Sequence, residues 1–249
     1  MMVNSKLQKH LDKVSKADKE IGIRPTGIEL LDKQFGGGLP ENSLVCIYAD
    51  PISMPEAFLY QLSSERKCYY FNTFRPVQYI QENISSMGFP VENVEFVDVF
   101  SQYGKIEFEQ FLVDSKWRKK EVFSFINNQL EELSTSEDFN VIFDSISFFM
   151  KLDVDSALKE WLLNKIYLLS KESKNLFYMY LMKGVHPTEI INMVIEISDV
   201  VFNIRSEEAG AQIKSVLSIP KIRNRPPVKE TFKFNVEEGV KIDTSKDIA

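Results

Sequence analysis

The chain has 249 residues, of which 44% are hydrophobic and 27% are charged, proportions that are ordinary for a globular protein. Its formal net charge of −6 weighs against a protein that holds nucleic acid mainly by neutralising phosphates. No apolar run approaches the ~20 residues that cross a bilayer, and residues 1–20 are charged rather than apolar, so we expect a cytoplasmic protein with no membrane segment and no secretory signal.

Helical and extended patterns alternate along the chain after a charged leader, residues 1–20. Helical periodicity is found at 27–34, where Thr26 can cap the first turn, and at 55–65, 76–87, 117–134, 154–173 and 187–197. Strand-like apolar runs lie at 43–49, 67–74, 94–100, 140–146, 176–182 and 199–205, and the tail adds three β-like segments with a hairpin turn at 236–240. This alternation indicates an α/β fold with a mostly parallel sheet flanked by helices, and the helix-free tail indicates antiparallel edge strands. We predict a single domain over residues 21–249.

The cysteines and histidines predict no metal site. Cys46 and Cys68 each lie within a strand-like stretch, and neither belongs to a Cys-x-x-Cys pair or has a histidine nearby. We interpret them as buried, reduced thiols on neighbouring strands. His10 lies in the charged leader and His186 precedes a proline, so the sequence predicts neither a catalytic triad nor a zinc cluster.

The stretch "VCIYADPISMPEAFLYQL", residues 45–62, has the strand–loop–helix frame of a P-loop but lacks its residues. A P-loop reads Gly-x-x-x-x-Gly-Lys-[Ser/Thr], because its backbone N–H groups wrap the phosphates, its lysine contacts them and its hydroxyl holds Mg²⁺. Here Pro55 stands at the lysine position and Glu56 at the Ser/Thr position. The degenerate phosphate-loop positions are Ala49, Asp50, Pro51, Ile52, Ser53, Met54, Pro55 and Glu56.

Each replacement weakens phosphate binding for a physical reason. Ile52 and Met54 resist the positive φ angles that glycine tolerates, and they add bulk where a phosphate must approach. Pro55 removes both a cation and a backbone donor, although it suits the first position of a helix. Glu56 brings negative charge to an anion site, and the helix dipole favours a carboxylate there by ~0.3–1 kcal/mol. The loop is therefore suited to starting a helix, and one hypothesis is that Glu56 fills the niche of a phosphate.

Several segments in this order and spacing resemble the KaiC/RadA-like branch of the RecA-type ATPases, a family common in archaea. The segments are "PTGIELLDKQFGGGLPENSLVCIYADP", "ISSMGF", "VEFVDVF", "NVIFDSIS", "EISDVVFNI", "LSIPKIRNRPP" and "FKFNVEEGVKI". The resemblance covers almost the whole chain after the leader and implies a RecA-like P-loop NTPase fold. It also implies that Asp144 is the residual Walker B acid, and that Lys221 and Arg223 form a Lys-x-Arg motif that reaches across a subunit interface in the rings and filaments of that family.

The catalytic positions depart from the family pattern. Where the family carries one or two glutamates that activate water, this chain has Phe74 and Arg75, and neither can act as a carboxylate base. Without a Ser/Thr at position 56, we interpret Asp144 as a hydrogen-bonding group at a strand end rather than a metal ligand. Ser145 and Ser147 are interpreted as local capping groups, since no base lies near them in the sequence.

Two basic segments have alternative interpretations. Lys221 and Arg223 are either cations of a subunit interface or part of a solvated basic turn that balances acidic residues, namely Glu207, Glu208 and Glu230. A basic, aromatic start of the helix at 117–134 could contact nucleic acid, but such runs are more often solvated faces. Its residues are Trp117, Arg118, Lys119 and Lys120.

We favour the hypothesis that the chain is a pseudo-ATPase, with no catalytic residue, that acts as a regulatory or assembly subunit. Its partner would be a second copy or an active RecA/KaiC-like paralogue, and it would need no cofactor or metal, with weak binding of ATP and Mg²⁺ left open. A nucleotide-binding ATPase with a non-standard P-loop is the first alternative. A DNA-repair accessory protein is the second, and the negative net charge makes nucleic acid an unfavourable partner.

Overall fold

The computed structural model describes residues 22–104, 115–133, 138–209, 212–226, 228–237 and 239–243, so the predicted leader lies outside the described residues. The strands of the main sheet are β3 (Leu44–Ala49), β4 (Lys67–Asn72), β5 (Val94–Asp98), β6 (Phe139–Asp144), β7 (Leu176–Met182), β8 (Val200–Ala209), β9 (Gln212–Ile222), β10 (Thr231–Glu237) and β11 (Gly239–Asp243). Two short strands, β1 (Ile23–Arg24) and β2 (Leu39–Pro40), pair separately.

The main sheet is parallel over most of its width and antiparallel at one edge. In the described part of the chain it has nine strands in the order β11-β10-β9-β8-β3-β7-β6-β4-β5. The ladders from β8 through β3, β7, β6 and β4 to β5 are all parallel, whereas those joining β8 to β9, β9 to β10 and β10 to β11 are antiparallel. The predicted α/β sheet with antiparallel C-terminal edge strands is confirmed, and so is the hairpin, in which Val236 pairs with Val240.

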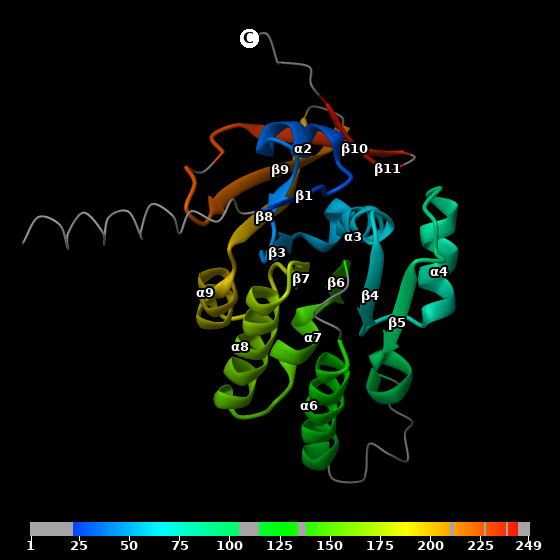
Figure 1. The fold of residues 1–249 in the computed structure, drawn as a ribbon, viewed down its shortest axis with the longest axis vertical. Helices are drawn as coiled ribbons and strands as arrows, with labels where there is room; N and C mark the ends of the chain where they lie inside the picture. Colours follow the sequence, from blue (N-terminus) through cyan, green and yellow to red (C-terminus); the bar gives the residue numbers. More distant parts are fainter. Residues whose placement is uncertain are drawn as a thin grey trace, which may run out of the picture.

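Helices cover both faces of the sheet (Figure 1). They are α2 (Glu29–Phe35), α3 (Pro55–Ser64), α4 (Val77–Ser86), α6 (Ser115–Glu131), α7 (Ile146–Lys151), α8 (Ser156–Glu172) and α9 (Thr188–Ile197), with a 3-10 turn, η1 (Pro51–Ser53), and a π-helical turn, η2 (Phe100–Gly104). Alternate residues of β3 divide the core between the faces. Val45 and Ile47 pack with α2, α3 and the C-terminal strands, while Leu44 and Cys46 pack with α6, α7, α8 and α9.

Three local predictions were wrong. Ile146 was assigned to a strand but begins α7, because β6 ends at Asp144. Thr26 is not the N-cap of α2, which is Ile28, although the Thr26 hydroxyl does accept a hydrogen bond from the Ile28 N–H at 3.2 Å. The two cysteines are buried and free, but they do not lie on neighbouring strands, because β7 and β6 stand between β3 and β4.

The topology gathers loops at two edges of the sheet. Parallel strands share a direction, so the loops that follow β3, β4, β6 and β7 meet at one side, here named the carboxyl edge, which is where open α/β sheets bind ligands. The opposite side, the amino edge, holds the starts of β3 and β8 and the end of β9. Among the described residues no helix combines the length and the apolar character that crossing a membrane requires.

The turn after α2 provides a matched pair of substitutions. Gly36 and Gly38 both have positive φ angles, of 76° and 139°, but a Cβ added at Gly36 would meet open space. At Gly38 it would lie 2.1 Å from the backbone oxygen of Arg24. We expect Gly36→Ala to lower the free energy of unfolding by about 1–2 kcal/mol through backbone strain alone. Gly38→Ala should lower it by about 3 kcal/mol or more, since β1 must move. Urea unfolding of both variants checks this, and equal losses would contradict it.

Candidate functional site

The loop between β3 and α3 closes on itself through its own backbone. The N–H of Ser53 and its hydroxyl both donate to the carbonyl of Asp50, at 3.0 and 2.6 Å, which fixes η1. The Asp50 N–H donates to the Ile204 carbonyl on β8 at 3.2 Å. These donors therefore point into the protein rather than toward a ligand at the carboxyl edge.

The second half of the loop starts a helix. The N–H of Ala57 donates to the carbonyl of Met54 at 3.2 Å, and Pro55, which has no N–H, occupies the first helical position. Met54 adopts the left-handed conformation, with φ 53° and ψ 50°, so this non-glycine residue takes the positive φ that the sequence analysis expected it to resist. The strain costs roughly 1–2 kcal/mol. Ile52 and Met54 expose 77% and 48% of their surface, so apolar side chains cover this loop.

Arg75 links two carboxylates at the carboxyl edge. It follows β4, and its Nη2 lies 3.3 Å from Oδ2 of Asp144, at the end of the neighbouring strand β6. Its Nη1 lies 3.8 Å from Oε1 of Glu56, in the first turn of α3. The position compared above with a catalytic glutamate thus carries a cation that faces Asp144, the residue that the resemblance implies to be the residual Walker B acid.

Asp144 is buried, and its Oδ2 and its backbone oxygen accept hydrogen bonds from neighbouring donors. The Tyr70 hydroxyl donates to Oδ2 at 2.8 Å, and Thr73 donates to the backbone oxygen through its N–H at 2.9 Å and its hydroxyl at 3.0 Å. Burial raises the pKa of Asp144, and the nearby Arg75 charge and the Tyr70 hydrogen bond partly oppose that rise. The expected hydrogen-bonding role of Asp144 at a strand end agrees with these contacts.

These residues do not fit a magnesium–nucleotide complex. Mg²⁺ needs oxygen ligands in near-octahedral geometry, together with substrate phosphates. Oδ2 of Asp144 already contacts a guanidinium and a phenol, and Glu56 occupies the position compared above with the Ser/Thr of a P-loop. Within the described ranges, no three histidine, cysteine or acidic side chains gather as a metal site.

Ser147 has a base beside it after all. The Nε2 atom of His186 lies 2.8 Å from the Ser147 hydroxyl, which also accepts the N–H of Met182 at 2.8 Å. The pKa of His186 is lowered by burial first and then by the charges of Lys151 and Lys159. Ser147 is completely buried, so no substrate reaches its oxygen, and the pair joins α7 to the end of β7.

The Lys-x-Arg motif lies at the amino edge, on the opposite side of the sheet. The Lys221 Nζ donates to the backbone oxygens of Ile195 and Glu196, at 2.7 and 2.9 Å. Arg223 Nη2 lies 3.4 Å from the Glu196 oxygen. Both cations thus meet the last carbonyls of α9, where the helix dipole favours positive charge. Glu207, named above as a balancing acid, pairs instead with Arg205 at 2.5 Å.

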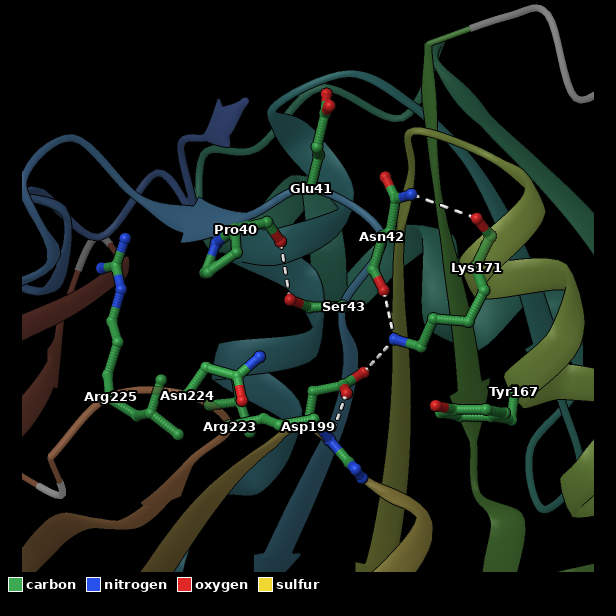
Figure 2. A pocket seen from close by; sticks show the side chains of 12 residues that line it. Pro40, Glu41, Asn42, Ser43, Tyr167, Lys171, Asp199, Arg223, Asn224 and Arg225 are labelled. Carbon is green, nitrogen blue, oxygen red and sulfur yellow. Dashed lines mark hydrogen bonds and ion pairs between the residues drawn. The ribbon is translucent and has the colours of Figure 1, made fainter. Parts of the chain in front are cut away.

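A buried carboxylate, Asp199, organises this edge (Figure 2). Its Oδ1 pairs with Nε of Arg223 at 2.7 Å, and its Oδ2 accepts from the Leu44 N–H at 2.8 Å and from the ammonium of Lys171. Lys171 also donates to the backbone oxygen of Asn42. A cavity of about 320 Å³ lies beside the group, lined by Pro40, Glu41, Asn42, Ser43, Tyr167, Lys171, Asp199, Val200, Ile222, Arg223, Asn224 and Arg225.

The structure separates the predicted site residues into two groups. The loop 49–56 and Asp144 meet at the carboxyl edge, whereas Lys221 and Arg223 lie at the amino edge. Of the basic helix start, only the side chain of Lys120 is described, and it is exposed. The ion pairs of Arg75 and Asp199 were not predicted from the sequence. The available signal was a charged residue next to a buried strand, which suggests that it has a partner of opposite charge. Which residue is that partner depends on the order of strands in the sheet, and the local sequence does not show that order.

One solved structure similar to this chain is that of a KaiC-like protein from the hyperthermophilic archaeon Pyrococcus horikoshii OT3. The two share 14% sequence identity and superpose with a TM-score of 0.67, over 90% of this chain and 99% of that one. At this identity the likeness shows the fold, and it confirms the predicted RecA-like α/β architecture.

Comparison with curated proteins gives no match. A sequence-family model, described as a family of unknown function (DUF7125), matches residues 23–249. Since this match spans nearly the whole chain and includes both edges of the sheet, the protein belongs to that family.

Proposed function

We propose that the protein is a catalytically inactive RecA/KaiC-like domain that acts as a regulatory or assembly subunit. The observation that carries the inactivity is the β3–α3 loop. Its Asp50 and Ser53 N–H groups bond to carbonyls of the chain, and Pro51 and Pro55 have none to offer. Phosphate binding at such a loop depends on free N–H donors and a lysine; this loop has no lysine, and four of its backbone positions offer a phosphate no free donor.

The neighbouring residues support the same proposal. Arg75 stands at a position where KaiC/RadA-like ATPases carry a catalytic glutamate, and it pairs with Asp144, so neither residue is free to activate water or to hold Mg²⁺. A guanidinium stays protonated at any physiological pH and cannot serve as a general base. ATP hydrolysis would therefore have to proceed without a phosphate-binding loop, without a ligand for Mg²⁺ and without a general base.

An assembly role is supported by the difference between the two edges. A head-to-tail contact joins two different surfaces of the same kind of chain. The carboxyl edge exposes apolar side chains of Ile52, Met54 and Phe74, whereas the amino edge exposes 43% of the Arg223 side chain beside a cavity. The amino edge of one chain could face the carboxyl edge of a second copy, or the nucleotide of an active RecA/KaiC-like paralogue.

Calorimetric titration with ATP and Mg²⁺ tests the inactivity. We expect no measurable heat of binding up to millimolar nucleotide, because the loop has no lysine, few free N–H donors, and a carboxylate, Glu56, in the first turn of α3. An ATPase of similar size, titrated in the same buffer, shows that the method would detect binding. Micromolar affinity would overturn the proposal and favour the alternative of an ATPase with a non-standard loop.

The interface role of the Lys-x-Arg motif is tested by Lys221→Ala and Arg223→Ala, singly and together. We expect sedimentation to show the wild-type protein in a species larger than the 28.8 kDa monomer, alone or with an active paralogue. The double variant should bind its partner at least ~10-fold more weakly, about 1.4 kcal/mol, since removing a cation from a buried interfacial charge pair costs more than this. Lys33→Ala, which removes an exposed lysine on α2, is the matched control. Unchanged association and unchanged partner ATPase in the double variant would show that these cations serve only the fold.

A further inference from the structure

We propose that Arg75 is the built-in counter-ion of the carboxyl edge, whose guanidinium holds Glu56 and Asp144 together so that this edge is assembled with no bound ligand. The inference goes beyond the proposed function, because it concerns what replaces a ligand rather than what the chain fails to bind. It also predicts a behaviour that nucleotide titration does not measure.

The guanidinium of Arg75 lies where the segments that follow three different strands meet. Glu56 lies at the start of α3, Arg75 lies in the loop between β4 and α4, and Asp144 ends β6. The two terminal nitrogens of the guanidinium face different carboxylates, at 3.8 Å and 3.3 Å. A single side chain therefore links the loops that follow three strands of the parallel sheet.

Burial makes the Asp144 contact the dominant one. The Asp144 side chain is only 6% exposed, and removing the partner of a buried charge is strongly destabilising because the charge is left uncompensated. The Glu56 side chain is 35% exposed and its contact is longer, so solvent screens that interaction. Arg75 itself keeps 32% of its side chain exposed, which allows a small cation to reach the same place if the side chain is removed.

The backbone around Arg75 is fixed independently of its charge. The amide of Asn72, a fully buried residue at the end of β4, donates to the Arg75 carbonyl at 2.9 Å and to Oδ1 of Asp98 at 2.7 Å. Shortening the Arg75 side chain therefore leaves the loop anchored. The effect of removing the guanidinium on stability can therefore be measured while the loop keeps its conformation.

The test compares thermal unfolding of the wild type, Arg75→Ala and Lys165→Ala. Lys165 makes an ion pair of 3.3 Å with Glu131, whose side chain is 58% exposed, and serves as the matched control. We expect Arg75→Ala to lower Tm by about 4–8 °C and Lys165→Ala by about 2 °C at most.

Rescue by a free cation makes the test specific. Guanidinium chloride at about 20 mM is far below the molar concentrations that denature proteins. It should raise the Tm of Arg75→Ala, whereas KCl at the same ionic strength should not. The double variant Arg75→Ala/Asp144→Asn removes the buried charge as well, so it should melt above Arg75→Ala and gain nothing from guanidinium.

Two results would overturn the inference: a Tm of Arg75→Ala that matches the Lys165→Ala control, or equal responses of Arg75→Ala to guanidinium and potassium. If Arg75→Ala does not fold, Arg75→Lys and Arg75→Gln replace it: Arg75→Lys keeps a cation opposite Asp144 and should melt above Arg75→Gln, and equal Tm values of these two variants would be equally decisive against the inference. None of these outcomes depends on ATP, so a failure here leaves the proposed function to be decided by the calorimetric titration.

Discussion

The two-sided burial of β3 is the constraint on which the rest of the structure depends. Its alternate side chains enter two different cores, so both faces of the sheet must be covered by helices. Each parallel strand then needs a connection that crosses the sheet, and every such connection leaves from the carboxyl edge. The loop of residues 49–56, Arg75 and Asp144 therefore converge because the strands are parallel, whether or not a ligand binds among them.

Each edge of this sheet also contains a buried carboxylate that must be neutralised. Asp144 has Arg75 and Tyr70 at the carboxyl edge, and Asp199 has Arg223 and Lys171 at the amino edge. An unpaired buried charge would oppose folding by several kcal/mol, so these cations have a structural task before any functional one. For Arg223 this task coexists with the proposed interface role, because a large part of its side chain remains exposed.

The sequence predicted where helices and strands lie better than it predicted which of them are neighbours in the fold. Hydrophobic period and turn residues located the helices and strands, because these signals are local. The order of strands is not local, which explains why Cys46 and Cys68 were assigned to adjacent strands and why the pairing of Arg75 with Asp144 was missed. Ile146 was misassigned because an apolar run reads alike in a strand and in a short buried helix. Ser147 and His186 meet for the same non-local reason.

The carboxyl edge has the strand–loop–helix arrangement of a P-loop, but the loop uses its backbone groups differently. A P-loop leaves its N–H groups unpaired and depends on a ligand to satisfy them. In this chain Ser53 donates to the Asp50 carbonyl, the Asp50 N–H donates to the Ile204 carbonyl, and Pro55 has no donor. Met54 adopts a strained positive φ directly before the first residue of α3. Glu56 places a negative charge in the first turn of α3, and Arg75 supplies the positive charge that faces it. Because Glu56, Arg75 and Asp144 already contact one another within the chain, the exposed apolar side chains of Ile52 and Met54 are what this loop presents at its surface.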